Sequence, residues 1–147
     1  MNQRLSLDAI ATHLKTQSAL AGVHVGTGYD ANYLTAFGTT YPAVWVGAQR
    51  LTRLDDGRGY TGQYRQHCRV EVVFRLVVQR YAAGEISPEG ALNTLHDNVV
   101  AALTAYRPAD ADDAFVWESC QDGDLSESVM TADLVMSVTT TYASNSP

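Results

Sequence analysis

The sequence predicts an α+β fold, with a largely antiparallel sheet that carries two helices on one face in the order α-β-β-β-α-β-β. The main observation is an alternation of apolar and polar residues from Tyr64 to Tyr81. This two-residue period is typical of a strand, and the run is far longer than the usual length of about five or six residues. A second alternating run covers residues 129–142, and two segments with helical spacing begin after Ser6 and Ser87.

The first helix is predicted over residues 7–19. Ser6 is a suitable N-cap and Asp8 lies in the first turn, where a negative charge is favourable. Gly22 can end the segment. The apolar positions share one face of the predicted helix: Leu7, Ile10, Ala11 and Leu14.

Three strands are predicted next. The first covers about residues 23–27, and the second is the apolar segment 42–46, opened by Pro42. Residues 47–63 hold several glycines and mixed charges without a pattern, which indicates a long loop or the projecting tip of a hairpin. The long strand follows, and its buried face is predicted at the even positions: Cys68, Val70, Val72, Phe74, Leu76 and Val78.

The second helix is predicted over residues 88–106, because Ser87, Pro88 and Glu89 supply an N-cap, a first-turn proline and a first-turn acid. An acidic loop then leads to a strand at about 114–121. The segment Asp122-Gly123-Asp124 is predicted as a turn before the last strand. That strand presents one apolar face: Met130, Ala132, Leu134, Met136 and Val138.

Composition indicates one compact domain over residues 1–147, since 46% hydrophobic and 18% charged residues supply a core. No run approaches the roughly 20 apolar residues of a membrane span, and the N-terminus lacks the apolar run of a signal peptide. We therefore expect a soluble protein made inside the cell, with no membrane partner. Cys68 and Cys120 fall in strand segments and are expected to be reduced core residues.

Charge is distributed unevenly along a chain of net charge -6. Seven arginines lie between Arg50 and Arg80, whereas eight acidic residues and no lysine or arginine follow Arg107. The acidic total argues against specific nucleic-acid binding. The asymmetry predicts two complementary surfaces through which copies of the chain meet, although a solvated surface of uneven charge is the alternative. The basic set is Arg50, Arg53, Arg58, Arg65 and Arg69, and the acidic set is Asp110, Asp112, Asp113, Asp122, Asp124 and Glu127.

Aromatic residues are the candidate apolar anchors of such an interface, since large aromatic side chains supply much of the energy of protein contacts. Individual exposed ion pairs contribute only about 0–1 kcal/mol, so apolar burial has to provide most of the affinity. The candidates are Tyr29, Tyr33, Phe37, Tyr41 and Tyr60.

Patterns that carry catalysis or bind cofactors are scarce. The segment Gly26-Thr27-Gly28 lacks the third glycine and the helix of a dinucleotide fingerprint. The four histidines have no ligand spacing, and the acidic clusters lack the full calcium-loop pattern. The sequence thus predicts no enzyme activity, no cofactor and no metal. A small-molecule pocket is the alternative from another class, with His67 and Glu71 as its nearest candidates.

Several segments, taken together in their order, are similar to those of one known family. They are the helix ending in Leu14-Lys15, the strand 41–46, the long strand 64–81, the helical segment 92–103 and the closing strand to Tyr142. In element order and length the chain resembles the tail terminator (tail-completion) proteins of long-tailed bacteriophages. The likeness covers nearly the whole chain.

The resemblance implies a non-enzymatic virion protein at the tail-neck junction, made in the cytoplasm of the host bacterium. It implies a homo-hexameric ring that caps the tail tube, ends polymerisation of the tube protein and offers a surface to the head-neck connector protein. Similarity to the members with contractile tails would add a contact with the tail sheath. Another phage neck or head-completion protein is the alternative within this class.

Overall fold

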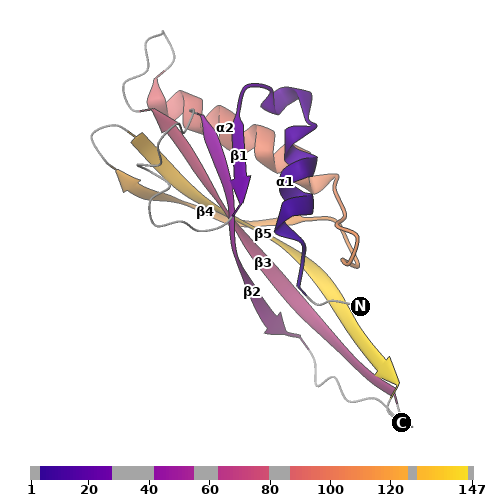
Figure 1. The fold of residues 1–147 in the computed structure, drawn as a ribbon. Helices are drawn as coiled ribbons and strands as arrows, with labels where there is room; N and C mark the ends of the chain where they lie inside the picture. The colour runs from indigo at the N-terminus through magenta and orange to yellow at the C-terminus, as the bar shows by residue number, and fades with distance from the viewer. Residues whose placement is uncertain (1–3, 28–41, 55–62, 80–86, 126–128, 146–147) are drawn as a thin grey trace.

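A computed structural model describes residues 4–27, 42–54, 63–79, 87–125 and 129–145 (Figure 1). The structure confirms the α+β class and the predicted order of elements. The elements are α1 (Leu7–Lys15), a short 3-10 turn (Ser18–Leu20), β1 (His24–Thr27), β2 (Ala43–Arg53), β3 (Gln63–Gln79), α2 (Pro88–Thr104), β4 (Val116–Leu125) and β5 (Val129–Asn145).

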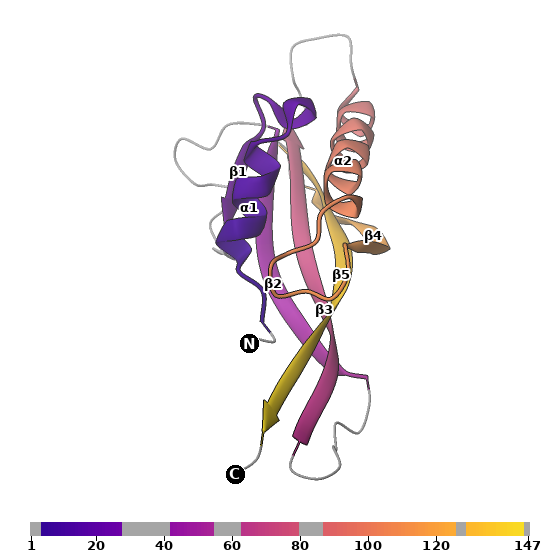
Figure 2. The ribbon, with the colours of Figure 1, turned by 90° about the vertical axis from the view of Figure 1, so that its right-hand side faces the viewer.

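The described strands form one five-stranded sheet in the order β1-β2-β3-β5-β4. β1 runs parallel to β2, and the other neighbouring pairs are antiparallel. Both helices cover the same face, with α1 over β1 and β2 and α2 over β3, β5 and β4 (Figure 2). The ends of β2, β3 and β5 continue past the helices as a twisted ribbon, and β4 forms one edge of the sheet (Figure 1).

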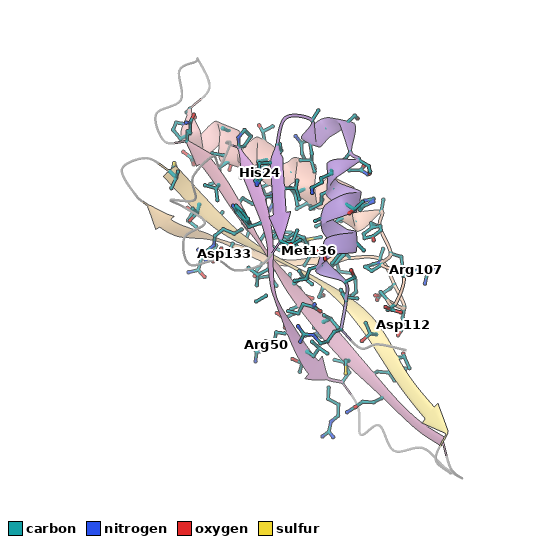
Figure 3. The ribbon with its side chains drawn as sticks, viewed as in Figure 1. His24, Arg50, Arg107, Asp112, Asp133 and Met136 are labelled. Atoms are coloured by element: carbon teal, nitrogen blue, oxygen red, sulfur yellow. The ribbon has the colours of Figure 1, made fainter. Side chains whose placement is uncertain are left out.

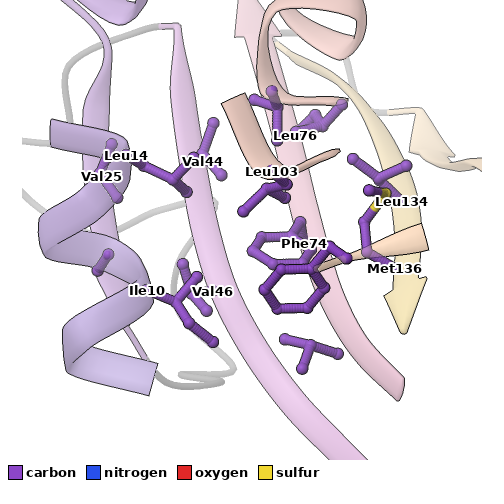
Figure 4. Close-up of a cluster of buried hydrophobic side chains, with 14 of the residues drawn as sticks. Ile10, Leu14, Val25, Val44, Val46, Phe74, Leu76, Leu103, Leu134 and Met136 are labelled. Atoms are coloured by element: carbon purple, nitrogen blue, oxygen red, sulfur yellow. The ribbon is translucent and has the colours of Figure 1, made fainter. Parts of the chain in front are cut away.

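The core lies between the sheet and the helices, as the long alternation predicts. Every even position of β3 from Cys68 to Val78 is buried. Phe74 has no exposed surface, and its ring meets that of Phe115 edge-on with 6.0 Å between the ring centroids. Figure 4 shows side chains from both helices and from β1, β2, β3 and β5 meeting in this layer: Ile10, Leu14, Val25, Val44, Val46, Phe74, Leu76, Leu103, Leu134 and Met136.

Both helices begin at the predicted caps. The Ser6 hydroxyl accepts a hydrogen bond from the Ala9 N–H, and the Ser87 hydroxyl accepts one from the Gly90 N–H. The first helix is shorter than expected, however. α1 ends at Lys15, because the Thr16 hydroxyl donates to the carbonyl of His13 at 2.7 Å and so completes the last turn.

Of the two alternatives predicted for residues 47–63, the loop is wrong in its first half, since β2 continues to Arg53. Residues 49–53 pair antiparallel with β3, as the alternative of a projecting hairpin predicts. A bulge between Val46 and Gln49 places one extra residue in β2 against β3. The residues that face the helices are therefore even-numbered up to Val46 and odd-numbered from Gln49. The amide of Gln49 pairs with the backbone of Leu5, accepting from its N–H at 2.9 Å and donating to its carbonyl at 2.8 Å. Residues 55–62 lie outside the described part of the chain.

The turn expected at Asp122-Gly123-Asp124 is also wrong, because this segment belongs to β4. A register shift between Asp122 and Leu125 accommodates it. Gly123 suits the irregular position, since a Cβ there would lie 2.5 Å from the Thr131 hydroxyl. The acidic residues of β4 are therefore held on a strand at the edge of the sheet.

Neither described helix is long and apolar enough to cross a membrane. Cys68 and Cys120 are both free thiols, as expected, but their settings differ. Cys68 is buried on the core side of β3, as predicted, whereas the predicted core position of Cys120 is wrong, because this residue is exposed on the edge strand β4.

Candidate interface surfaces

The first candidate surface lies on the ribbon beyond the helices and is named the ribbon patch: Arg50, Arg53, Leu54 and Arg69. All four residues are exposed. Figure 3 shows Arg50 on this lower part of β2. None of the three arginines forms an ion pair with a described residue. Leu54 extends the strand pairing, because its N–H donates to the carbonyl of His67 at 2.9 Å. Arg50, Leu54 and Arg69 lie on the face of the ribbon that points away from the helices, whereas Arg53, the register partner of Cys68, lies on the other face. The patch thus holds two arginines on the same face as one exposed apolar side chain, with a third arginine on the reverse face.

Two predicted members of the basic set have no described side chain. The backbone of Arg65 lies in β3, opposite Ala143 of β5, which places it further along the same ribbon. Arg58 lies outside the described residues.

The predicted acidic set is divided between two places. Asp110, Asp112 and Asp113 lie in the loop before β4, and this loop is fixed to β5 by the bridge between Ala111 and Thr140. Asp122 lies on β4, where it is exposed. Asp124 is placed only as backbone in β4, and Glu127 lies outside the described residues.

The loop acids Asp112 and Asp113 are engaged within the subunit. The Asp112 N–H donates to the carbonyl of Thr139 at 2.7 Å, and the Asp112 carboxylate accepts from the hydroxyl of Thr141 at 2.6 Å. The Asp113 carboxylate accepts from the N–H of Thr139 at 2.8 Å. Both carboxylates are exposed, but they hold the loop against β5 and are less available to a partner than the sequence suggests.

Register also places this loop beside the ribbon patch of the same subunit. Arg53 pairs with Cys68, Cys68 pairs with Thr140, and Thr140 bridges to Ala111. Three strand spacings separate Arg53 from Ala111, which amounts to about 14 Å. The loop acids therefore belong to the same end of the molecule as the arginines, not to an opposite surface.

The second candidate surface lies on β4 and is named the edge patch: Val116, Trp117, Glu118 and Asp122. Val116 is 55% exposed and Trp117 is 47% exposed. Glu118 sits in a register shift between Trp117 and Ser119, and its carboxylate accepts from the Ser137 hydroxyl at 2.6 Å. Sequence reasoning missed the two apolar residues. The signal available in the sequence was that Val116 and Trp117 are adjacent. Neighbouring residues of a strand point to opposite faces, so only one of them can enter the core.

A groove of about 260 Å³ runs beside the edge patch, between α2 and β4. The Trp117 indole N–H donates to Nε2 of His96 at 3.3 Å, and Nδ1 of His96 donates to the Asp97 carboxylate at 3.0 Å. These two bonds hold the His96 ring with its proton on Nδ1. The lining combines apolar walls with one acid: Leu92, Asn93, His96, Trp117, Cys120, Asp122 and Ala132.

Burial raises the pKa of the Cys120 thiol above its usual value, and the negative charges of Asp122 and Asp133 raise it further. The thiol therefore stays protonated at neutral pH. It is an exposed but weakly reactive group in the wall of the groove.

The other chemical candidates in the described part of the chain are not brought together. His67 contacts Thr141, with 2.9 Å between Nδ1 and the hydroxyl, and neither His67 nor Glu71 lines the groove. His13 is half-buried and stacks on Tyr106 with 3.9 Å between ring centroids. Among the described residues, no group of three His, Cys, Asp or Glu side chains is placed to hold a metal ion.

The aromatic anchors expected from the sequence cannot be located. All five candidates lie outside the described residues: Tyr29, Tyr33, Phe37, Tyr41 and Tyr60.

Comparison with known proteins identifies the family. The model of the phage tail terminator protein family matches residues 1–145. Among solved structures, the fold is similar to a chain of the "virion of native gene transfer agent (GTA) particle", with a TM-score of 0.62 and 15% identity over 94% of this chain and 96% of that one. No curated protein matches the sequence.

The family match defines a structural protein of the phage tail, and the solved structure shares its fold. The chain belongs to the phage tail terminator family, as its resemblance in sequence indicates.

Proposed function

We propose that this protein forms a ring of six copies that caps the phage tail tube, stops polymerisation of the tube protein and provides the surface on which the head-neck connector joins. Family membership supports the place at the end of the tail. The observation that carries the ring is the presence of two different exposed surfaces on one subunit, the basic ribbon patch and the acidic edge patch.

A closed ring needs such a pair of surfaces. In a head-to-tail interface, one surface of each copy meets a different surface of the next copy, and the series closes when the rotation between copies completes a circle. Opposite charges speed the encounter and fix the register of the contact. Of the predicted basic set, Arg50, Arg53 and Arg69 retain this role, and Asp122 retains it from the acidic set. Arg58, Arg65, Asp124 and Glu127 are proposed as outer members of the same two surfaces.

The proposed partners follow from the position of a tail terminator. One face of the ring contacts the tail tube protein and the other contacts the head-neck connector, with an added contact to the sheath in a contractile tail. The protein acts in the virion at the tail-neck junction after synthesis in the host cytoplasm. Its role is assembly, and no catalytic step, cofactor or specific nucleic-acid contact is proposed.

A polymerisation assay tests this function. Purified tail tube protein is allowed to polymerise with and without this protein, and tube lengths are measured by negative-stain electron microscopy. We expect shorter tubes, each with extra density at one end. Unchanged lengths and bare tube ends, at concentrations where the protein is assembled, would contradict the proposal. Immunogold labelling at the head side of the neck alone would favour the neck or head-completion alternative.

A further inference from the structure

We infer that the joint between neighbouring copies forms where Leu54 of one copy, with Arg50 and Arg69 on the same face of the ribbon, enters the groove between α2 and β4 of the next copy. This inference rests on the proposed ring and names the contact within it. The partner is a second copy of this chain.

The exposed apolar side chains of the described residues point to this contact. Three large hydrophobic side chains are exposed among the described residues: Leu54 at 46%, Val116 at 55% and Trp117 at 47%. They lie at two places, and each place carries charges of one sign: Arg50 and Arg69 share the face of the ribbon on which Leu54 lies, whereas Glu118 and Asp122 accompany the other two. An exposed apolar group with charges of one sign fits a surface with an apolar wall and charges of the other sign.

The two places cannot meet within one copy. Arg53 lies in the row of Thr140 of β5, and Asp122 lies in the row of Ala132. Eight residues of strand separate these rows, a distance of about 27 Å along β5. No side chain spans this distance, so the two surfaces can meet only when they belong to different copies.

The groove suits a leucine side chain. Leu92, Ala132 and the Trp117 ring supply apolar walls, and the volume of about 260 Å³ exceeds the 150 Å³ or so of an apolar cavity that admits benzene. Asp122 lies in the lining, where it faces the arginines that arrive with Leu54. Neither Asp122 nor Arg69 has an ion-pair partner among the described residues, so forming this pair breaks no ion pair between them.

The competing acidic surface is less suitable. Asp112 and Asp113 already accept hydrogen bonds from β5, and their loop lies at the ribbon end of the subunit. The negative charges of this loop lie beside the ribbon patch of the same copy, where they would weaken the positive potential of that patch. They do not form a second surface on the far side of the sheet.

Cysteine cross-linking tests the contact, because Cys120 already lies in the groove and Cys68 is buried. The variant Leu54→Cys adds one exposed thiol at the ribbon end. After treatment with a thiol oxidant such as diamide at mildly alkaline pH, a non-reducing gel should display a ladder of covalent oligomers up to the ring size. The ladder should vanish in the double variant Leu54→Cys with Cys120→Ser. A matched control, Thr12→Cys, places an exposed thiol on α1 and should give no ladder.

A charge exchange gives an independent readout. Arg69→Asp should weaken assembly by about tenfold or more, and Asp122→Arg in the same chain should restore most of it. Both residues are exposed, so circular dichroism should be unchanged.

The outcomes separate this inference from the proposed function. Rings that form with no disulfide between residue 54 and Cys120, and with no rescue by the charge exchange, would overturn the contact and leave the ring intact. A dimer linked only through residue 54, which persists after Cys120→Ser, would also overturn the contact. A protein that stays monomeric under all conditions would contradict the ring and the contact together.

Discussion

Arg75 of β3 and Asp133 of β5 form a bidentate ion pair on the face of the sheet that the helices leave open. Nε donates to one carboxylate oxygen at 2.6 Å and Nη2 donates to the other at 2.8 Å. The two residues are direct partners in the strand register, and their side chains are only 16% and 32% exposed. The pair therefore helps to hold the two longest strands in register.

The first prediction concerns this pair. Asp133→Asn removes the charge that the Arg75 guanidinium meets, so the free energy of unfolding should fall by about 1–2 kcal/mol. Urea unfolding measures the change. Asp110→Asn, in an exposed loop, is the matched control and should stay within about 0.5 kcal/mol of the parent. Equal stability of the two variants would mean that the ion pair contributes nothing beyond solvation.

The second prediction concerns the core. Phe74 is fully buried, so Phe74→Ala should leave a cavity and lower the free energy of unfolding by about 3–5 kcal/mol. Val73→Ala, on the opposite and half-buried face of the same strand, should cost about 1 kcal/mol. Thermal melts compare the two. If Phe74→Ala melts at the same temperature as the parent, the face of β3 assigned to the core is not the buried one.

The third prediction concerns a close approach between β1 and β2. A Cβ added at Gly26 would lie 2.5 Å from the six-membered ring of Trp45, closer than real Cβ contacts allow. Gly26→Ala should therefore destabilise the protein by about 1–3 kcal/mol, because the indole has to move. The added change Trp45→Val should recover part of this loss, measured against Trp45→Val alone. Additive effects of the two substitutions would show that the contact does not cause the loss.

The fourth prediction concerns pH. The pKa of Cys120 is raised by burial and then by Asp122 and Asp133, so iodoacetamide should label this thiol at half its maximal rate only above the usual cysteine pKa. Asp122→Asn should shift that midpoint to lower pH, whereas Asp110→Asn should leave it in place. A midpoint at or below the usual cysteine pKa would contradict the assigned environment.

The same shift has a consequence for stability. Since the folded-state pKa lies above the unfolded one, the contribution of Cys120 is fully present below the unfolded pKa and is lost as pH rises through the folded pKa. Cys120→Ser should reduce the fall in stability over this alkaline range.

Much of the fold is predictable because the pattern lies within single elements. The alternation in β3 marks its buried face through Val70, Val72 and Phe74, and the caps Ser6 and Ser87 mark where both helices begin. The end of β2 is not predictable in this way. The bulge after Val46 changes which positions face the helices, so the alternation on its two sides does not join into one run.

The sequence predicts the sign of the charge on each candidate surface but not the position of that surface in the fold. The sequence groups Asp112 with Asp122 because they are close along the chain and alike in charge. Pairing of the loop with Thr140 of β5 puts Asp112 at the ribbon end, whereas pairing of β4 with Ala132 puts Asp122 at the other. Contacts between distant segments decide these positions, and a local pattern of charges does not contain them.

The ring itself is tested most directly by native mass measurement across a range of salt concentrations. At low salt we predict one dominant species of six copies of the 15.9 kDa chain, which dissociates as salt screens the two charged patches. A monomer at every salt and protein concentration, or a dimer with no larger species, would contradict a head-to-tail ring that closes the tail tube.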